Sequence, residues 1–163
     1  MILTLDLGEN TGWAYLGGEG LVTYGTQVFA NTRFQGGGMQ FLMFSRWLTQ
    51  MLPFSEVYFE EVKQHAKSVA AGHAYGGFMA ILTSWCEANK VPYRGVPVGT
   101  IKKHVTGNGG ASKDAVKEAV EKHGFNPQDD NSADALALML YVRSKVIVNI
   151  GYPATIHKRE PNV

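Results

Sequence analysis

The first third of the chain alternates apolar and polar positions with a period of two, which is the pattern of β-strands. Strands are predicted over residues 2–7, 12–16 and 21–29, with the turn sequences GENT and GGEG between them. Turns this short join antiparallel neighbours, so the three strands should form a meander.

The rest of the chain alternates between helical and strand spacing. Apolar residues first recur at helical intervals from Met39, and Pro53 ends that helix. Residues 56–62 and 91–98 predict a fourth and a fifth strand. Further helices are predicted over residues 70–90, 99–105, 113–124 and 129–145.

This order of elements predicts an α/β fold with a mixed five-stranded sheet, whose first three strands are antiparallel, and with helices on both faces. That is the ribonuclease H-like class. A chain of 163 residues has the length of one ordinary domain. We expect a single domain of this class over residues 1–150 and an irregular C-terminal tail over 151–163, which has no period.

Composition narrows the class of protein. The apolar fraction of 45% and the charged fraction of 18% are typical of a folded soluble protein. No membrane span or secretory signal is recognisable, which predicts a cytoplasmic protein without a membrane partner. The lone Cys86 excludes an internal disulfide, and no Cys/His spacing predicts a zinc site. Any metal should therefore be a hard cation bound by oxygen.

The net charge of +1 conceals an uneven distribution. Residues 1–62 carry two basic and six acidic side chains, whereas residues 63–128 carry nine basic and four acidic ones. This asymmetry is what a polyanion-binding face beside an acidic metal site would produce, although clustered lysines are more often only a solvated surface.

Carboxylates interrupt three of the apolar elements. Asp6 ends the first strand and shares a face with Thr4, where it could ligate a metal or accept hydrogen bonds from the following turn. Glu60 and Glu61 end the fourth strand on opposite faces, so only one of them can join Asp6. If the first and fourth strands are neighbours, two carboxylates meet at adjacent strand ends and repel each other, a cost that a divalent cation removes.

The last predicted helix supplies a third carboxylate. Asp129 and Asp130 suit an N-cap and a first helical turn, but Asp134 lies beyond that turn among apolar residues. Helical spacing places Asp134 on one face with either Asp130 or Asn131. Such oxygen ligands favour Mg²⁺, for which Mn²⁺ can substitute, and two ions could drive in-line phosphodiester hydrolysis without a small-molecule cofactor.

These motifs resemble the RuvC family of Holliday-junction resolvases, most closely its phage and prophage members. The segments LDLGENTGWAYL, YFEEV, IKKHVTGNGGASKDAV and NSADALAL match four family motifs in order, within residues 1–145. The resemblance implies Asp6, Glu60 and Asp134 as catalytic metal ligands, Lys102 and Lys113 at the scissile phosphate, and a homodimer that resolves four-way DNA junctions into 5′-phosphate and 3′-hydroxyl ends.

The match departs from the family at two places. Three residues before the last acidic residue, the family carries Asp or His, whereas this chain has Asn131 preceded by Asp130, so either could be a fourth ligand. A junction-stacking aromatic of the family falls near Lys63. The expected catalytic and DNA-binding set is therefore Asp6, Glu60, Asp130, Asn131, Asp134, Lys63, Lys67, Lys102, Lys103 and Lys113. Lys102 and Lys103 point to different helix faces, so at most one should reach the active site.

Dimerisation and function each leave alternatives open. A ridge of small residues in the helix from residue 70, formed by His73, Gly76, Gly77, Ala80 and Ser84, could contact a second copy or pack within the chain. The function could instead be a broader debranching nuclease or a non-catalytic DNA-binding scaffold. An ATP-binding kinase of the acetate or sugar type also begins with such a loop, but it needs two lobes.

Overall fold

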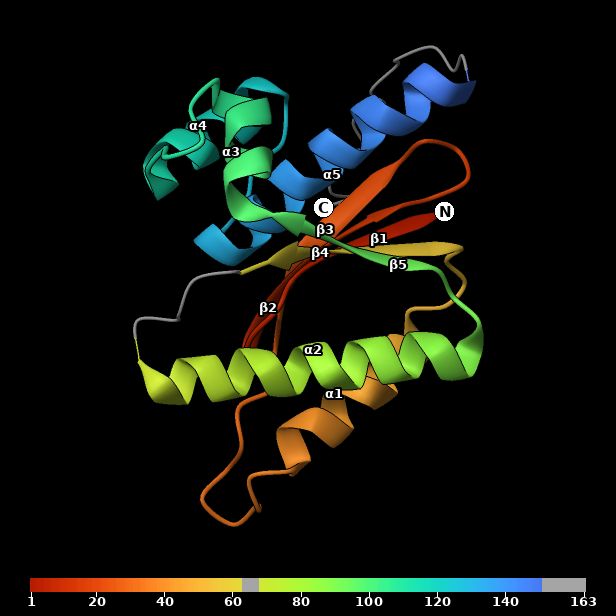
Figure 1. Cartoon of the computed structure of the whole chain (residues 1–163), viewed down its shortest axis with the longest axis vertical. Coiled ribbons are helices and arrows are strands. Elements are labelled where there is room, and N and C mark those ends of the chain that lie inside the picture. The colour runs from red at the N-terminus through yellow and green to blue at the C-terminus, as the bar shows by residue number, and fades with distance from the viewer. Residues whose placement is uncertain (63–67, 151–163) are drawn as a thin grey trace, which may run out of the picture.

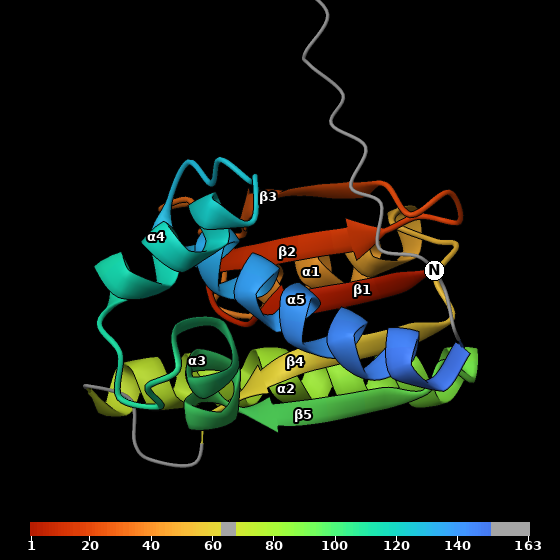
Figure 2. The ribbon, with the colours of Figure 1, turned by 90° about the horizontal axis from the view of Figure 1, so that it is seen from above.

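A computed structural model describes residues 1–62 and 68–150, with backbone alone for 146–150. Five strands form one mixed sheet in the order β3-β2-β1-β4-β5 (Figures 1 and 2). The strands are β1 (Ile2–Asp6), β2 (Asn10–Leu16), β3 (Val22–Val28), β4 (Glu56–Glu61) and β5 (Tyr93–Pro97). Pairing is antiparallel among the first three and parallel for β1–β4 and β4–β5. The predicted mixed sheet is confirmed.

Helices cover both faces of the sheet, also as predicted (Figure 1). One face carries α1 (Met39–Gln50) and α2 (Val69–Asn89), and the other carries α3 (Val98–Thr106), α4 (Lys113–Lys122) and α5 (Asp130–Ile150). The helix α5 continues to Ile150, beyond its predicted end at residue 145. The predicted tail over 151–163 lies outside the described residues, and the described part holds no helix long and apolar enough to span a bilayer.

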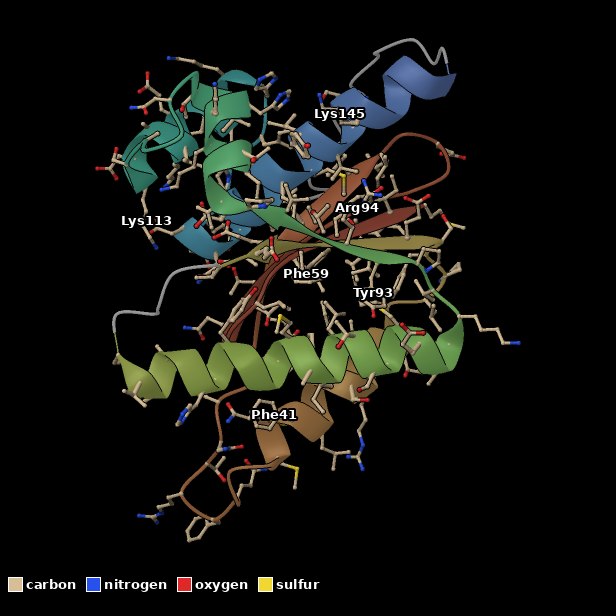
Figure 3. All side chains as sticks on the ribbon, in the orientation of Figure 1. Phe41, Phe59, Tyr93, Arg94, Lys113 and Lys145 are labelled. Atoms are coloured by element: carbon tan, nitrogen blue, oxygen red, sulfur yellow. The ribbon has the colours of Figure 1, made fainter. Side chains whose placement is uncertain are left out.

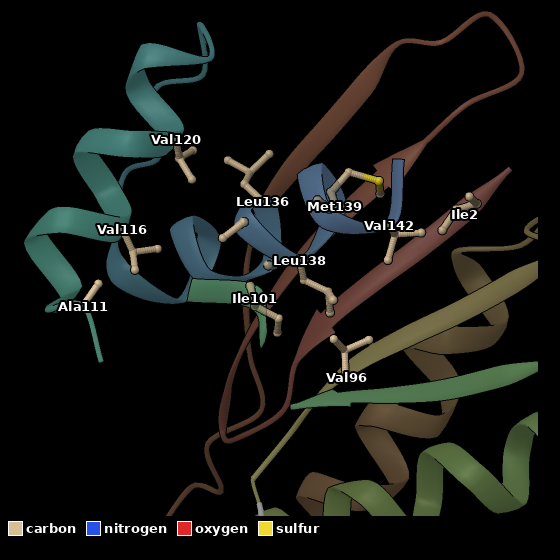
Figure 4. Packing of buried hydrophobic residues seen from close by; sticks show 13 residues of the cluster. Ile2, Val96, Ile101, Ala111, Val116, Val120, Leu136, Leu138, Met139 and Val142 are labelled. Carbon is tan, nitrogen blue, oxygen red and sulfur yellow. The ribbon is translucent and has the colours of Figure 1, made fainter. Parts of the chain in front are cut away.

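Two apolar cores lie on the two faces of the sheet. Beneath α1 and α2, edge-to-face aromatic pairs such as Phe44 and Phe78, with ring centroids 5.2 Å apart, fill the core around Leu3 and Leu5. On the other face, α5 packs Leu136, Leu138 and Met139 against the sheet and against α3 and α4 (Figure 4). Because strand side chains alternate, the odd-numbered residues of β1 serve the first core, and its even-numbered residues face α5.

Strand register decides where the acidic residues meet. The parallel pairing of β1 and β4 aligns Thr4 with Tyr58 and Leu5 with Phe59. Asp6 and Glu60 are the next residues along each strand, so they lie side by side at the carboxyl ends, on the face that α5 covers. The condition on which the predicted carboxylate pair rested, that the first and fourth strands are neighbours, is therefore met.

The helix α5 is attached to this end of the sheet at two points. The buried Thr4 hydroxyl donates a hydrogen bond of 2.8 Å to the carbonyl oxygen of Ala135. Gly12, which pairs with Asp6 across the β1–β2 ladder, lies against the backbone carbonyl of Asn131, and a side chain there would collide with it. These contacts seat the start of α5 directly over Asp6.

Candidate active site

Three carboxylates, Asp6, Glu60 and Asp134, gather where β1, β4 and the first turns of α5 meet. All three are partly buried. Burial raises the pKa of Asp6 well above its usual value, and the charges of Glu60 and Asp134 raise it further. The β1–β4 register and the contacts of α5 with Thr4 and Gly12 bring these residues together from distant parts of the sequence.

Glu60 and Asp134 carry the same electrostatic signature. Burial, followed by the charge of Asp134, raises the pKa of Glu60 to about 7, against the opposing effect of Lys102 and Lys113. Burial also raises the pKa of Asp134, although the same two lysines oppose it. In this cluster ionisation of the carboxyls costs free energy, which the two lysines offset only in part.

Two lysines border the carboxylates from the helical side. The Nζ atom of Lys102 in α3 donates a hydrogen bond of 2.7 Å to the carbonyl oxygen of Ala111, which ties α3 to the glycine-rich loop before α4. Lys113 opens α4 directly after its N-cap, Ser112, whose hydroxyl accepts from the Ala115 amide at 3.2 Å. Lys103 is exposed, so of the neighbouring pair only Lys102 is turned toward the acidic cluster.

Asp130 lies at the edge of the cluster. Its Oδ2 atom accepts from the Nζ of Lys113 at 3.2 Å, and both side chains are largely exposed. Burial tends to lower the pKa of Lys113, but this bond and the charges of Asp130, Asp134 and Asp6 raise it overall. Asn131 instead packs its backbone against Gly12. The structure thus places Asp130 against Lys113, and both candidates for a fourth ligand stay predictions.

Asp129, which precedes Asp130 and Asn131, caps the start of α5, as the sequence suggests. The Oδ1 atom of Asp129 accepts from the Ser132 amide at 2.8 Å and from the Thr26 hydroxyl at 2.7 Å. Although burial opposes it, these hydrogen bonds hold the pKa of Asp129 below its usual value. Asp129 therefore fixes the start of α5 to β3, and its charge adds slightly to the raised pKa of Asp6.

The hydrogen bonds of the turn after Asp6 test whether its carboxylate serves to close that turn. The Thr11 hydroxyl donates a hydrogen bond of 2.6 Å to the Gly8 carbonyl, and Thr11 is buried. Within residues 1–62 and 68–150, the Asp6 carboxylate accepts no hydrogen bond from this turn. Thr11 closes the turn, so the alternative in which Asp6 does so is wrong.

The carboxylate oxygens of Asp6, Glu60 and Asp134 suit a hard divalent cation, although these side chains do not lie close enough together to bind one. Among the described residues, no three His, Cys, Asp or Glu side chains converge closely enough to hold a metal ion as they stand. Three carboxylates with raised pKa values nevertheless supply the oxygen ligands that Mg²⁺ or Mn²⁺ requires. Asp6, Glu60 and Asp134 would bind such an ion after their side chains move closer together.

Basic residues that the motifs did not single out lie elsewhere on the α5 face. A cavity of about 280 Å³ beside β5 is lined by Arg94 and Lys145 together with Tyr58 and Tyr141. Figure 3 shows these two cations farther along the sheet than Lys113. The remaining predicted DNA contacts, Lys63 and Lys67, lie outside the described residues.

Some residues of the small-residue ridge in α2 pack within the chain, and others lie on its surface. A side chain at Gly77 would collide with the ring of Phe41 in α1, so this glycine serves packing within the chain. Gly76 has no neighbour within 4 Å of such a position, and His73 and Ala80 are exposed. Packing within the chain therefore holds for Gly77, and contact with a second copy stays a prediction for the exposed residues.

Three residues of the site escaped the sequence analysis. Thr4 and Gly12 anchor α5, and the Tyr75 hydroxyl in α2 bonds to the backbone of β4 beside Glu60. Each had only a weak sequence signal: a polar residue in an apolar strand, a glycine in a strand, and a tyrosine at a helical core position.

Comparison with known proteins shows the fold. No protein-family model and no curated protein matches the sequence significantly. Thermus thermophilus RuvC in complex with a Holliday junction substrate is 18% identical, with a TM-score of 0.66 over 88% of this chain and 95% of that chain. A second structure of T. thermophilus RuvC is 19% identical, with a TM-score of 0.67 over 88% of this chain and 96% of that one.

A mitochondrial protein has the same architecture. The yeast mitochondrial Holliday junction resolvase Ydc2 is 13% identical, with a TM-score of 0.60 over 91% of this chain and 81% of that chain. At these identities the likeness is one of fold. The ribonuclease H-like class that the order of elements predicted is confirmed.

Proposed function

We propose that this chain is an Mg²⁺-dependent, structure-selective endodeoxyribonuclease that resolves four-way DNA junctions. The observation that carries the proposal is the cluster of Asp6, Glu60 and Asp134, whose pKa values are all raised, on a fold shared with RuvC and Ydc2. The resemblance of its motifs to those of phage and prophage resolvases belongs to the same proposal.

The carboxylates would hold the metal, and the lysines would bind the substrate. When bound, two divalent cations would activate a water and stabilise the leaving oxygen, which gives 5′-phosphate and 3′-hydroxyl ends. Lys102 and Lys113 flank the acids and would offset the charge of the scissile phosphate. Because burial and Asp134 raise the pKa of Glu60 to about 7, this carboxyl should ligate poorly at acidic pH.

Resolution of a four-way junction needs two opposed cuts, and a pair of sites related by a twofold axis provides them. We therefore include a homodimer in the proposal. The exposed side of α2, at His73, Gly76 and Ala80, is a surface that such a dimer could use.

The direct test is cleavage of labelled four-way, three-way, flap and linear duplex DNA in Mg²⁺ and in EDTA. We expect Mg²⁺-dependent cutting of the four-way junction and little cutting of linear duplex. Asp6→Asn, Glu60→Gln and Asp134→Asn should each reduce cleavage by a factor of roughly 10³ or more while junction binding persists. The exposed Glu19 provides a control, since Glu19→Gln should cut normally.

The other outcomes identify the alternatives. Binding without any cutting would favour a scaffold, and comparable cutting of flaps and three-way DNA would favour a debranching nuclease. Equal cutting of linear duplex would remove structure selectivity.

A further inference from the structure

The strand β4 extends past the end of its neighbour β1, at the position of Glu60. Pairing between the two strands ends with Leu5 and Phe59, and β1 itself ends at Asp6. On the other side, β5 still pairs with Glu61 through Pro97. The last residues of β4 therefore have a strand on one side only.

Backbone direction shows which groups lose their partner. The Val57 amide donates to the Pro92 carbonyl at 2.9 Å, so odd-numbered residues of β4 direct their backbone groups toward β5. Because these directions alternate along a strand, Glu60 and Val62 direct theirs toward the side that β1 has left. Without another partner, the Glu60 carbonyl and the Val62 amide would be unpaired beside the acidic cluster.

One side chain satisfies both groups. The Tyr75 hydroxyl in α2 donates to the Glu60 carbonyl at 3.0 Å and accepts from the Val62 amide at 3.2 Å. A residue of a parallel strand would bond the carbonyl of one residue and the amide two residues later in the same way. The hydroxyl thus replaces the missing strand for one more step of the ladder.

The position of Tyr75 connects this ladder to the carboxylates. The ring is partly buried at the margin of the core beneath α1 and α2, so it approaches β4 from the face opposite to the Glu60 side chain. Its hydroxyl reaches the Glu60 carbonyl and the Val62 amide from that side. The hydroxyl supports the backbone of Glu60 without occupying the space where a phosphate or metal would bind.

We propose that Tyr75 is a positioning residue of the nuclease site, which holds the Glu60 backbone in strand geometry so that its carboxylate can close on a metal with Asp6 and Asp134. This inference rests on the function proposed above. Residues that orient metal ligands typically change metal affinity or activity by a factor of 10–100 when altered.

The test compares Tyr75→Phe with a matched control, Tyr15→Phe. The Tyr15 hydroxyl also donates to a backbone carbonyl, that of Pro53 at 2.7 Å, and its strand position pairs with Leu3, toward the opposite end of β1. Both variants lose one tyrosine hydroxyl that donates to a backbone carbonyl, and Tyr75→Phe also loses the bond from the Val62 amide. Only Tyr75→Phe loses a hydroxyl beside Glu60.

Three quantities are measured for wild type and both variants: Mn²⁺ affinity by calorimetry without DNA, the Mg²⁺ concentration for half-maximal junction cleavage, and the Kd for junction DNA in EDTA. We expect Tyr75→Phe to weaken Mn²⁺ binding and to raise the Mg²⁺ requirement roughly tenfold or more. Saturating Mg²⁺ should restore much of the cleavage, the Kd for DNA should stay unchanged, and Tyr15→Phe should match wild type in all three.

Contrary results separate the two proposals. If wild type cuts and Tyr75→Phe equals it in Mn²⁺ affinity and Mg²⁺ requirement, the positioning role is wrong and the nuclease stands. A Tyr75→Phe protein that no longer folds, or that Mg²⁺ does not restore, would make Tyr75 a structural residue and overturn the inference. A wild type that cuts no DNA overturns the nuclease and the inference with it.

Discussion

The Thr4 hydroxyl of β1 donates a hydrogen bond of 2.8 Å to the carbonyl oxygen of Ala135, the residue that follows Asp134 in α5. The bond is buried and joins two parts of the chain that are 131 residues apart. It sets the height of α5 above the sheet at the turn that carries the third carboxylate.

Substitutions of Thr4 should distinguish the effect of this hydrogen bond from the effect of side-chain packing. Thr4→Val keeps the shape but loses the donor, so we expect the free energy of unfolding to fall by about 1 kcal/mol and cleavage to fall several-fold. Thr4→Ser keeps the donor and loses a buried methyl group, so it should lose similar stability yet retain cleavage. Denaturant unfolding and single-turnover cleavage measure the two effects. Equal cleavage by both variants would show that the bond does not position Asp134.

Gly12 should tolerate no side chain. A methyl group there meets the Asn131 backbone, so Gly12→Ala should displace the start of α5 and cost roughly 1–3 kcal/mol of stability with a large loss of cleavage. Gly17→Ala is the matched control, because its nearest contact, the Leu21 carbonyl, lies at 3.6 Å. Thermal unfolding and cleavage should change little in the control. If both alanine variants behave alike, the close approach at Gly12 is not what seats α5.

The raised pKa of Glu60 makes stability depend on pH in the metal-free protein. Its carboxyl binds a proton more tightly when folded, so the free energy of unfolding should decrease as pH rises from about 4.5 to 7. Glu60→Gln should flatten this decrease and raise the metal-free Tm at pH 7.5 by several degrees. Thermal unfolding across pH, with Glu19→Gln as control, measures the effect.

Added Mg²⁺ should restore the stability that the metal-free protein loses when Glu60 ionises. At pH 7.5 we expect millimolar Mg²⁺ to raise the Tm of wild type and to change that of Glu60→Gln much less. An equal rise in both proteins would place the bound ion away from Glu60.

Lys113 should contribute to phosphate binding more than to the stability of the fold. Lys113→Ala should slow single-turnover cleavage and lower the slope of log affinity against log salt by roughly one. Lys122→Ala provides a control on the same helix, since Lys122 pairs with the exposed Glu118 at 2.8 Å. Gel-shift titrations over a range of salt concentrations measure the slope. A slope shared by wild type and Lys113→Ala would return this lysine to the solvated surface.

The sequence was sufficient to predict the sheet and the places of the acids, because both follow from local periodicity. Strand alternation put Asp6 and Glu60 at strand ends, and helical spacing marked Asp134 as an acid beyond the first turn. Their meeting needed one further fact, that β1 and β4 are neighbours, which the sequence left as a condition and the register supplies.

The residues that hold the site together could not be predicted in that way. Thr4 is one polar residue in an apolar strand until Ala135 lies above it, and Gly12 is a strand glycine until Asn131 approaches. Tyr75 has ordinary helical spacing, and its role depends on where β1 happens to end. These are contacts between distant segments, which no local pattern encodes.

The position of Asp134 on the last described helix also has a consequence for biosynthesis. Asp6 and Glu60 emerge early during translation, whereas α5 can dock on Thr4 and Gly12 only after most of the chain has been made. A nascent or partly folded chain therefore lacks the third acid, so the proposed metal site is incomplete until α5 has docked.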